Sequence, residues 1–593
     1  MNRMEQLNRQ LLTQRSIQHR PGTRAQRNRA MTLWAMVVVV LLVATGCSAI
    51  PMHGSVGKSD PLAPRNNSVN VSLQQFSPVD GAAPESIIRG FIDSGTGISD
   101  DFQVARQYLT PALAQSWAPD KRTLVYQDTF AVAPAAQSGV FDLTLNAVSS
   151  VDATGVLTPA KAESTEMLSM KLVQVDGQWR ISEVPDGVVI AEANFQTLYA
   201  PVSLFFYDPT FTYGVPDVRW LAGRTSRTAT SIVKAILQGP APYLQGAVVS
   251  AFPSGMALDR DSVPVNNGQA KVGLTAQQLL ATSIEQRQQM NAQLLTTFQK
   301  SLNTITEVQF LADDRSVDMG GTGDDVSHMI VDNPVPPTQI ALAQGDLVTF
   351  DGTKIGPIPG VSPVANLEPS APAISYSGKN FAFLSGVGNQ IFTVQANEAP
   401  LLTLAGVALT PPSFAPNGWL WSAAGDGSGL VMAIDPDDGG KLGTPVLLTV
   451  PWLVGQQVHT FRVSRDGTRA LVISEANGVS KVSITGIFKT GELPKELTAP
   501  IRLLHSGTPS LGVWAGDSSV AVMNPSATEP VVIEVLDLAV PAVQMDELKG
   551  VQWLSAGSGV RNVHAQTASE FYTNAGNYWE VDAKELQQAS FAG

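Results

Sequence analysis

The stretch Arg462–Ser474, RVSRDGTRALVIS, joins a short polar turn to a run of alternating apolar residues. The turn is centred on Gly467, and the run after it shows the two-residue period of a β-strand. The same design recurs along the C-terminal half of the chain, in SYSGKNFAFLSG from Ser375, SFAPNGWLWSA from Ser413, VWAGDSSVAVMN from Val513 and AQTASEFYTNAGNYWEV from Ala565. A weaker copy, QIALAQGDLVTFDG, begins at Gln339. One turn-and-strand unit is therefore repeated.

Successive copies lie about 40 to 50 residues apart, which leaves room for roughly four short strands in each repeat. That spacing predicts a β-propeller over residues 339–593, with about five or six blades. The alternative is a pair of β-sandwiches. The unit SRDGTRALV resembles the turn and strand of TolB-like and WD40-like blades. Propellers serve both as enzymes and as binding platforms, so this fold does not decide the function. Residues 316–338, before it, are predicted to be a linker.

Residues 196–315 mix helices and strands in an α+β order. We expect a strand at APVSLFFYDPT, a helix over 228–238, and a turn at Asn267–Gly268. An apolar stripe then predicts one long helix over 276–302, followed by the strand ITEVQFLAD. These landmarks resemble the GerMN domain of bacterial envelope proteins, a family that implies no catalytic residues. The glutamine-rich face of the long helix, which includes Gln286, is expected to face solvent.

Residues 84–195 begin with helical patterns and end with strands, which is again α+β. The segment DFQVARQYLTPALAQSW predicts a helix that Pro111 bends, and four strands follow it. The turn signal Asp176–Gly177 joins the last two strands. The hairpin VQVDGQWRISEVPDG resembles the closing strands of NTF2-like cone domains, which often contain a pocket. No acid and base stand together on the strands, so a packing or binding role is expected.

The first 46 residues read as a signal peptide. An Arg-rich segment precedes the apolar run LWAMVVVVLLVATG from Leu33. That run suits an export signal and is shorter than the roughly 20 apolar residues of a membrane-spanning helix.

Cys47 ends this run and is the one cysteine of the chain. The preceding Ala44-Thr45-Gly46 resembles a bacterial lipobox, although Ala44 stands where Leu, Val or Ile is usual. The resemblance implies cleavage between Gly46 and Cys47, with S-diacylglycerol and an N-acyl group on Cys47. Two or more acyl chains hold a protein stably on a membrane. The alternatives are an exported protein with a free cysteine and an uncleaved anchor.

Residues 47–83 are rich in Pro, Gly, Ser and Asn, which predicts a flexible tether between the lipid and the first domain. The segment GSVGKS within it is similar to part of a nucleotide-binding P-loop. Met52 stands where that motif needs its first glycine, and no helical pattern follows. The sequence therefore predicts no nucleotide site here.

Charge and composition argue against several other classes. The formal net charge is -13, but residues 1–46 carry seven Arg and one Glu, a net of +6, so the remainder carries -13 - 6 = -19. An acidic body argues against nucleic acid as a partner. A single cysteine excludes an internal disulfide and a cysteine-based zinc site. No nucleophile-elbow motif is present, and Asp435, Asp437 and Asp438 lack the glutamate that closes a calcium loop. We expect no enzyme, no metal and no cofactor.

The order of signal, lipobox, tether, NTF2-like domain, GerMN-like domain and propeller resembles the actinobacterial LpqB lipoprotein family. That resemblance implies an accessory lipoprotein of the MtrA–MtrB two-component system on the outer face of the plasma membrane. It also implies contact with the extracytoplasmic part of the sensor kinase, and effects on cell-wall homeostasis and division. The alternative is a lipoprotein that binds cell-wall glycan or peptide, with peptidoglycan as its partner. A propeller hydrolase is a third class, which the missing motifs disfavour.

Overall fold

The computed structural model describes residues 73–98, 101–161, 164–222, 227–321, 329–437, 439–576 and 578–593. The predicted signal peptide and most of the predicted tether lie outside these ranges. Among the described residues, none of the helices combines the length and the apolar character that crossing a membrane requires.

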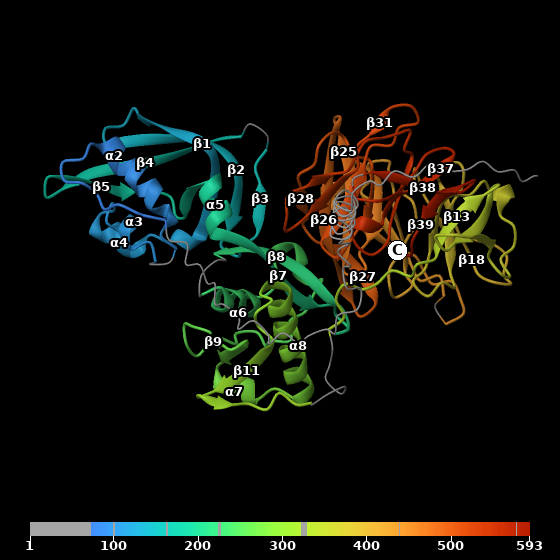
Figure 1. Ribbon diagram of the computed structural model, residues 1–593, viewed down its shortest axis with the longest axis horizontal. Helices are drawn as coiled ribbons and strands as arrows, with labels where there is room; N and C mark the ends of the chain where they lie inside the picture. Colours follow the sequence, from blue (N-terminus) through green and yellow to red (C-terminus); the bar gives the residue numbers. More distant parts are fainter. Residues whose placement is uncertain are drawn as a thin grey trace, which may run out of the picture. The chain divides into compact units, whose positions relative to one another are not determined.

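The first domain is a six-stranded sheet with short helices beside it (Figure 1). The sheet order is β5-β4-β2-β1-β6, with β3 paired to β2, and all pairs are antiparallel except β1 with β6. Its strands are β1 (Arg122–Pro134), β2 (Val140–Asp152), β3 (Leu157–Pro159), β4 (Thr165–Val175), β5 (Gln178–Glu183) and β6 (Val188–Ala191). Its helices are α2 (Pro84–Asp93), α3 (Gln103–Arg106), α4 (Pro111–Ser116) and α5 (Glu192–Leu198). The α+β prediction is confirmed.

The turn between β4 and β5 forms where the sequence predicts it. Asp176 and Gly177 both have positive φ, 52° and 77°, as a two-residue hairpin of the primed type requires. The apolar stripe of α2, Ile87, Ile88, Phe91 and Ile92, is buried against the sheet.

The predicted bent helix over Asp101–Trp117 is wrong, because the structure has two separate helices there. Pro111 is the first residue of α4, where its missing N–H costs nothing. Between α3 and α4, Leu109 forms a β-bridge with Ile181 of β5. Tertiary pairing to the sheet therefore replaces the continuous helix.

Residues 73–83, the last part of the predicted tether, contact the first domain. The backbone N–H of Gly81 donates to Gln178 Oε1 at 2.7 Å, and the Tyr108 hydroxyl donates to the carbonyl of Phe76 at 2.8 Å. This part of the tether is held in place by specific hydrogen bonds.

The second domain combines a hairpin with a four-stranded sheet, and helices pack against both. Its strands are β7 (Tyr199–Tyr207), β8 (Gly214–Ala222), β9 (Val265–Asn266), β10 (Gln269–Gly273), β11 (Glu307–Ala312) and β12 (Arg315–Ser316). Its helices are α6 (Thr228–Gln238), η4 (Pro242–Leu244), α7 (Ala276–Leu280) and α8 (Ile284–Ser301). β7 pairs with β8, and the larger sheet has the order β12-β11-β10-β9, in which β10 and β11 are parallel.

The predicted long helix over 276–302 is interrupted after Leu280. The Ser283 hydroxyl accepts the backbone N–H of Gln286 at 3.1 Å and caps the new helix α8. The break changes the helical phase, so Leu280 and Ile284, two apolar positions of the predicted helix, are 57% and 61% exposed. The later apolar positions of the helix are buried as predicted: Met290, Leu294 and Phe298.

The C-terminal region forms six sheets of four main strands among the described residues, which confirms the propeller and rules out two sandwiches. The first sheet contains β13 (Gln339–Ala343), β14 (Asp346–Phe350), β15 (Ile355–Pro357) and β39 (Gln587–Ser590). The second contains β16 (Ser370–Ile374), β17 (Phe381–Leu384), β18 (Gln390–Val394) and β19 (Leu401–Ala405). The third contains β20 (Ser413–Phe414), β21 (Leu420–Ala423), β22 (Leu430–Ile434) and β23 (Val446–Thr449).

The remaining blades follow the same antiparallel order. The fourth contains β24 (Gln457–Val463), β25 (Arg469–Ala476), β26 (Val479–Thr490) and β27 (Leu493–Leu497), with β28 (Ile501–Leu503) on β26. The fifth contains β29 (Leu511–Trp514), β30 (Ser519–Met523), β32 (Glu534–Asp537) and β33 (Val543–Gln544). The sixth contains β35 (Trp553–Ala556), β36 (Val563–Gln566), β37 (Glu570–Asn574) and β38 (Trp579–Lys584). β31 (Pro530–Val531) pairs with β34 (Leu548–Lys549) outside the blades.

The C-terminal strand β39 closes the ring. It pairs antiparallel with β13 and so completes the blade that begins at Gln339. The blades on either side hold it: Gln588 Oε1 accepts the N–H of Ala371 at 2.6 Å, and Trp553 Nε1 donates to the carbonyl of Ala589 at 2.9 Å. The first blade therefore contains strands from both ends of the propeller sequence.

Candidate functional site

The lipid-attachment site that the sequence predicts, cleavage at Gly46 with acylation of Cys47, lies outside the described residues. The described residues hold no group of three or more His, Cys, Asp or Glu side chains placed to bind a metal. What they do hold is a series of buried ionic side chains where the domains meet and at the propeller axis.

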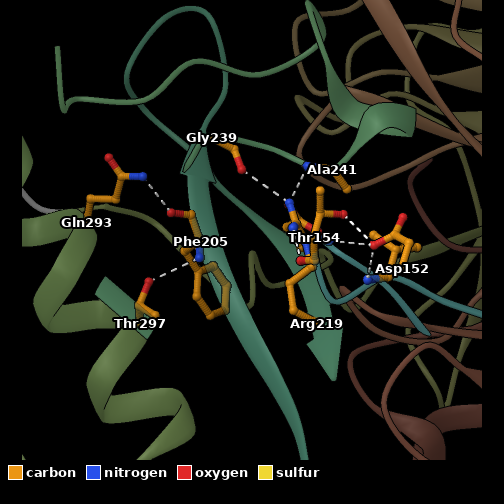
Figure 2. A network of polar contacts seen from close by, with 10 residues as sticks. Asp152, Thr154, Phe205, Arg219, Gly239, Ala241, Gln293 and Thr297 are labelled. Atoms are coloured by element: carbon orange, nitrogen blue, oxygen red, sulfur yellow. Dashed lines mark hydrogen bonds and ion pairs between the residues drawn. The ribbon is translucent and has the colours of Figure 1, made fainter. Parts of the chain in front are cut away.

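Arg219 and Asp217 form a fully buried ion pair on β8, with 2.6 Å between Nη2 and Oδ2. They are two residues apart on one strand, so their side chains leave the same face of β8. Nη1 of Arg219 donates to the carbonyl of Thr154 in the first domain, and Nη2 also donates to the carbonyl of Gly239 after α6 (Figure 2). Asp217 accepts the N–H of Ala241 at 2.8 Å. One ion pair thus joins three segments.

The protonation of this pair is set by two opposing effects. Burial alone would lower the pKa of Arg219, but the adjacent Asp217 carboxylate, with smaller contributions from Tyr243 and Asp152, outweighs burial and raises that pKa above its usual value. Arg219 is therefore charged in the folded protein at any ordinary pH.

The turn that meets Arg219 is shaped by its own side chains. Asp152 Oδ1 accepts the backbone N–H groups of Thr154 and Val156, at 2.8 and 3.0 Å. Gly155 has φ of +88°, and a Cβ there would lie 3.2 Å from the Cβ of Arg219. A glycine is needed both for the backbone conformation and for the close approach of the two domains.

A buried glutamine ties helix α8 to the strand β7. Gln293 Nε2 donates to the carbonyl of Phe205 at 2.9 Å, and the N–H of Phe205 donates to Thr297 Oγ1 at 3.0 Å (Figure 2). Gln293 Oε1 also accepts the N–H of Ala251. Gln286, expected to face solvent, is half-buried, and its amide donates to the carbonyl of Ala251 at 3.2 Å. The burial of Gln293 and Thr297 could have been predicted from the sequence, because both follow the buried stripe at helical spacing.

The second domain also meets the fourth blade of the propeller. One buried apolar cluster contains Leu294 and Phe310 of the second domain together with Leu471 and Val482 of the propeller. The Thr498 hydroxyl donates to the backbone carbonyl of Tyr243 in η4. The core of the second domain is therefore continuous with that of the fourth blade.

The turn around Gly467, where the sequence repeat is clearest, contains a second buried ion pair. Asp466 Oδ2 lies 2.5 Å from Arg469 Nη2, and Asp466 also accepts the Ser464 hydroxyl at 2.7 Å. Burial would raise the pKa of Asp466, but the Arg469 guanidinium together with the hydroxyls of Thr468 and Ser464 outweighs it and lowers that pKa. The Arg469 guanidinium also lies 5.1 Å from the ring centroid of Trp514. The sequence pattern predicts the turn but not this pairing.

A small cavity of about 50 Å³ lies where the innermost strands β24, β29, β35 and β39 meet, at the propeller axis. Arg462 and Arg465 line it, and their residues are only 7% and 5% exposed. Arg462 Nη1 donates to the carbonyl of Pro412 at 2.7 Å, and Arg465 Nη2 donates to the carbonyl of Gly557 at 2.7 Å. Burial lowers the pKa of Arg462 to about 10, so it stays charged at neutral pH.

Models of known protein families match the chain in the same order as the domains of the structure. Residues 77–196 match the family model described as lipoprotein LpqB, N-terminal domain, and residues 345–589 match the lipoprotein LpqB beta-propeller domain. Residues 203–318 match a model described as sporulation and spore germination. The chain belongs to the LpqB lipoprotein family. The predicted family, and the GerMN-like and propeller architecture, are thereby confirmed.

Relatives in this family match almost the full chain. Lipoprotein LpqB of Rhodococcus opacus is 26% identical over 591 residues, which covers 94% of each chain. Lipoprotein LpqB of Streptomyces avermitilis and that of Mycolicibacterium smegmatis are each 26% identical and cover 84% of this chain and 87% of their own.

Similar solved structures cover less than half of this chain. A virginiamycin B lyase from Staphylococcus aureus is 12% identical, covers 43% of this chain and 86% of its own, and has a TM-score of 0.29. A chain of a nidogen/laminin complex is 9% identical, covers 43% and 98%, and has a TM-score of 0.33. Sequence identities and TM-scores this low support no inference about activity.

Proposed function

We propose that this protein is a lipid-anchored extracytoplasmic lipoprotein that modulates the sensor kinase of a two-component system by direct contact. Through the kinase it affects cell-wall homeostasis and division. The observation that carries the proposal is the match to lipoprotein LpqB relatives along 94% of the chain.

The anchor explains how a weak contact becomes sufficient. Diacylglycerol on the Cys47 sulfur and a further acyl chain on its amino group bury enough methylene groups to hold the protein on the membrane stably. Confinement to the outer face raises its effective concentration near a membrane-bound kinase. A contact that prefers one conformation of the kinase then shifts the population of its signalling states.

The anchor is tested by replacing Cys47 with serine in the full chain. Wild-type protein is expected to incorporate a labelled fatty acid and to sediment with membranes, whereas Cys47→Ser loses the label and the signal peptide stays uncleaved. Ser48→Ala is the matched control and should behave as wild type. A Cys47→Ser protein that is still cleaved and acylated would overturn the anchor.

The kinase contact is tested by crosslinking in the native envelope, with phosphorylation of the response regulator as the second readout. We expect a crosslink between the propeller or second domain and the extracytoplasmic part of the sensor kinase. Loss of the protein should change regulator phosphorylation. If neither a crosslink nor a change in phosphorylation is found, the kinase proposal is wrong even if the lipid anchor holds.

A second candidate is a lipoprotein that binds cell-wall peptide or glycan, and the axial cavity with its two arginines favours it. A cavity of about 50 Å³ corresponds to the space of only a few water molecules, which is too small for a sugar ring. A peptide carboxylate is therefore the better fit. Retention on purified peptidoglycan, compared between wild type and Arg462→Gln, separates this candidate from the kinase proposal.

A further inference from the structure

Arg462 and Arg465 bring two cations to the axis of the propeller. Arg462 belongs to the innermost strand β24, and Arg465 lies in the turn that follows it. Both residues are more than nine-tenths buried and both line the axial cavity. The cavity is also lined by Tyr376 and Trp514.

The charge of these two arginines is not balanced as that of the other buried arginines is. Arg219 and Arg469 are equally buried, and each contacts an aspartate carboxylate at 2.6 and 2.5 Å. Among the described residues, no carboxylate oxygen lies within 4.0 Å of Arg462 or Arg465, whose nearest acceptors are backbone carbonyls. Asp517 and Asp332 act on Arg465 from beyond that distance, whereas burial is the one effect on the pKa of Arg462. A buried cation without a direct carboxylate contact is costly, so the chain keeps this pair at a free-energy cost.

The two guanidinium groups that line the cavity have more N–H donors than acceptors. A guanidinium carries five N–H donors, and the structure gives one acceptor to Arg462 and two to Arg465 within the described ranges. Burial raises the pKa of Tyr376, which keeps its hydroxyl protonated and able to donate. A forked pair of N–H groups matches the two oxygens of a carboxylate or phosphate. The volume of about 50 Å³ fits such a group and little more.

We propose that the axial cavity of the propeller binds a small oxyanion, a carboxylate or a phosphate group, through Arg462 and Arg465, with the Tyr376 hydroxyl as a further donor. This site is independent of the sensor-kinase proposal, since it rests on the cavity alone. Trp514 holds Arg462 in place by donating its indole N–H to the backbone carbonyl of Arg462 at 2.9 Å.

Isothermal titration of the full chain in detergent tests the site, with sodium phosphate, sodium acetate, Gly-Gly and Gly-Gly amide as probes in chloride buffer of constant ionic strength. We expect saturable binding at one site per chain. Binding of phosphate alone identifies a phosphate source. Binding of acetate and of Gly-Gly, but not of its amide, identifies a carboxylate source.

Variants assign the binding to this cavity. Arg462→Gln and Arg465→Gln should each raise the Kd at least tenfold, because each removes a charge-assisted contact. Arg502→Gln, on the exposed face of β28, is the matched control and should bind as wild type. Tyr376→Phe keeps the ring and should raise the Kd by a few fold.

If the glutamine variants fail to fold, Arg462→Lys retains the cation but loses the forked pair of N–H groups, and it should still bind more weakly than wild type. No binding of any probe by wild type, or equal binding by the cavity variants, would overturn the proposal.

Discussion

Arg219 joins three parts of the chain with one side chain, the β2–β3 turn, strand β8 and the end of α6. We predict that Arg219→Met costs roughly 3–5 kcal/mol in the free energy of unfolding, because it leaves the Asp217 carboxylate buried without a counter-charge. Urea unfolding followed by tryptophan fluorescence measures this. Adding Asp217→Leu to the same chain should recover part of the loss.

The matched control is the exposed pair of Lys234 and Asp261, whose nitrogen and oxygen lie 3.5 Å apart. Lys234→Met should change the free energy of unfolding by less than about 1 kcal/mol, as is usual for surface ion pairs. Equal effects of Arg219→Met and Lys234→Met would contradict the role given to the buried pair.

His564 makes the stability of the sixth blade depend on pH. It stacks on Phe571 with 5.1 Å between ring centroids, and its Nδ1 lies 2.9 Å from Thr573 Oγ1. Burial lowers the pKa of His564 to about 4, and the smaller opposing effect of Asp582 does not cancel it. The unfolded chain therefore takes up a proton near pH 6.5, while the folded chain does so only near pH 4.

Stability should consequently fall as the pH drops from about 6.5 to about 4, by a total on the order of 3 kcal/mol from this group, and then level off. The midpoint of thermal unfolding measured from pH 7.5 to 4.5 tests this. His564→Gln should lose less stability over that interval than wild type. Identical pH profiles for the two proteins would show that the group does not titrate as described.

At the scale of elements, the break between α7 and α8 depends on a single cap. Ser283→Ala should lower the free energy of unfolding by about 1 kcal/mol, because the N–H of Gln286 loses its acceptor. Ser283→Asp keeps an acceptor at the same position and should remain close to wild type. Both are measured by urea unfolding, and an unchanged Ser283→Ala protein would mean that the backbone alone sets the break.

The same elements show what sequence reasoning can and cannot reach. Local chemistry suffices for the turns: Asn267 and Gly268 both adopt the positive φ that their pairing predicts, at 51° and 79°. Prediction from local chemistry fails where a distant segment competes. Leu109, for example, forms a β-bridge with Ile181 of β5 and does not continue the predicted helix. The burial of Gln293 likewise follows from backbone groups of Phe205, far away in sequence.

The axial site is a stronger example of this limit. Arg462 and Arg465 look like ordinary members of a repeated strand and turn. They become two cations without a direct carboxylate contact in one cavity only because ring closure brings four innermost strands together around them. No local sequence pattern predicts that these strands converge, whereas the repeat spacing does predict the propeller itself.

At the scale of the whole molecule, the propeller depends on β39. We predict that truncation after Leu586 lowers the midpoint of thermal unfolding by about 5–10 °C, because the backbone groups of β13 that face the axis lose their partner strand. Truncation after Ser590 keeps β39 and is the control, expected to unfold close to wild type. A truncation after Leu586 that unfolds as wild type would show that ring closure does not contribute.

Closure by β39 also imposes an order in time. β13 to β15 are among the first propeller strands to be synthesised, yet their blade stays incomplete until the strand at Gln587–Ser590 has been made. Domains otherwise fold one after another as the chain emerges. Here the first and second domains have all their own strands early, whereas the propeller waits for its end. A nascent propeller therefore presents an unfilled strand position for the whole time that the five later blades are being made, and this is the period when it most needs protection from other chains.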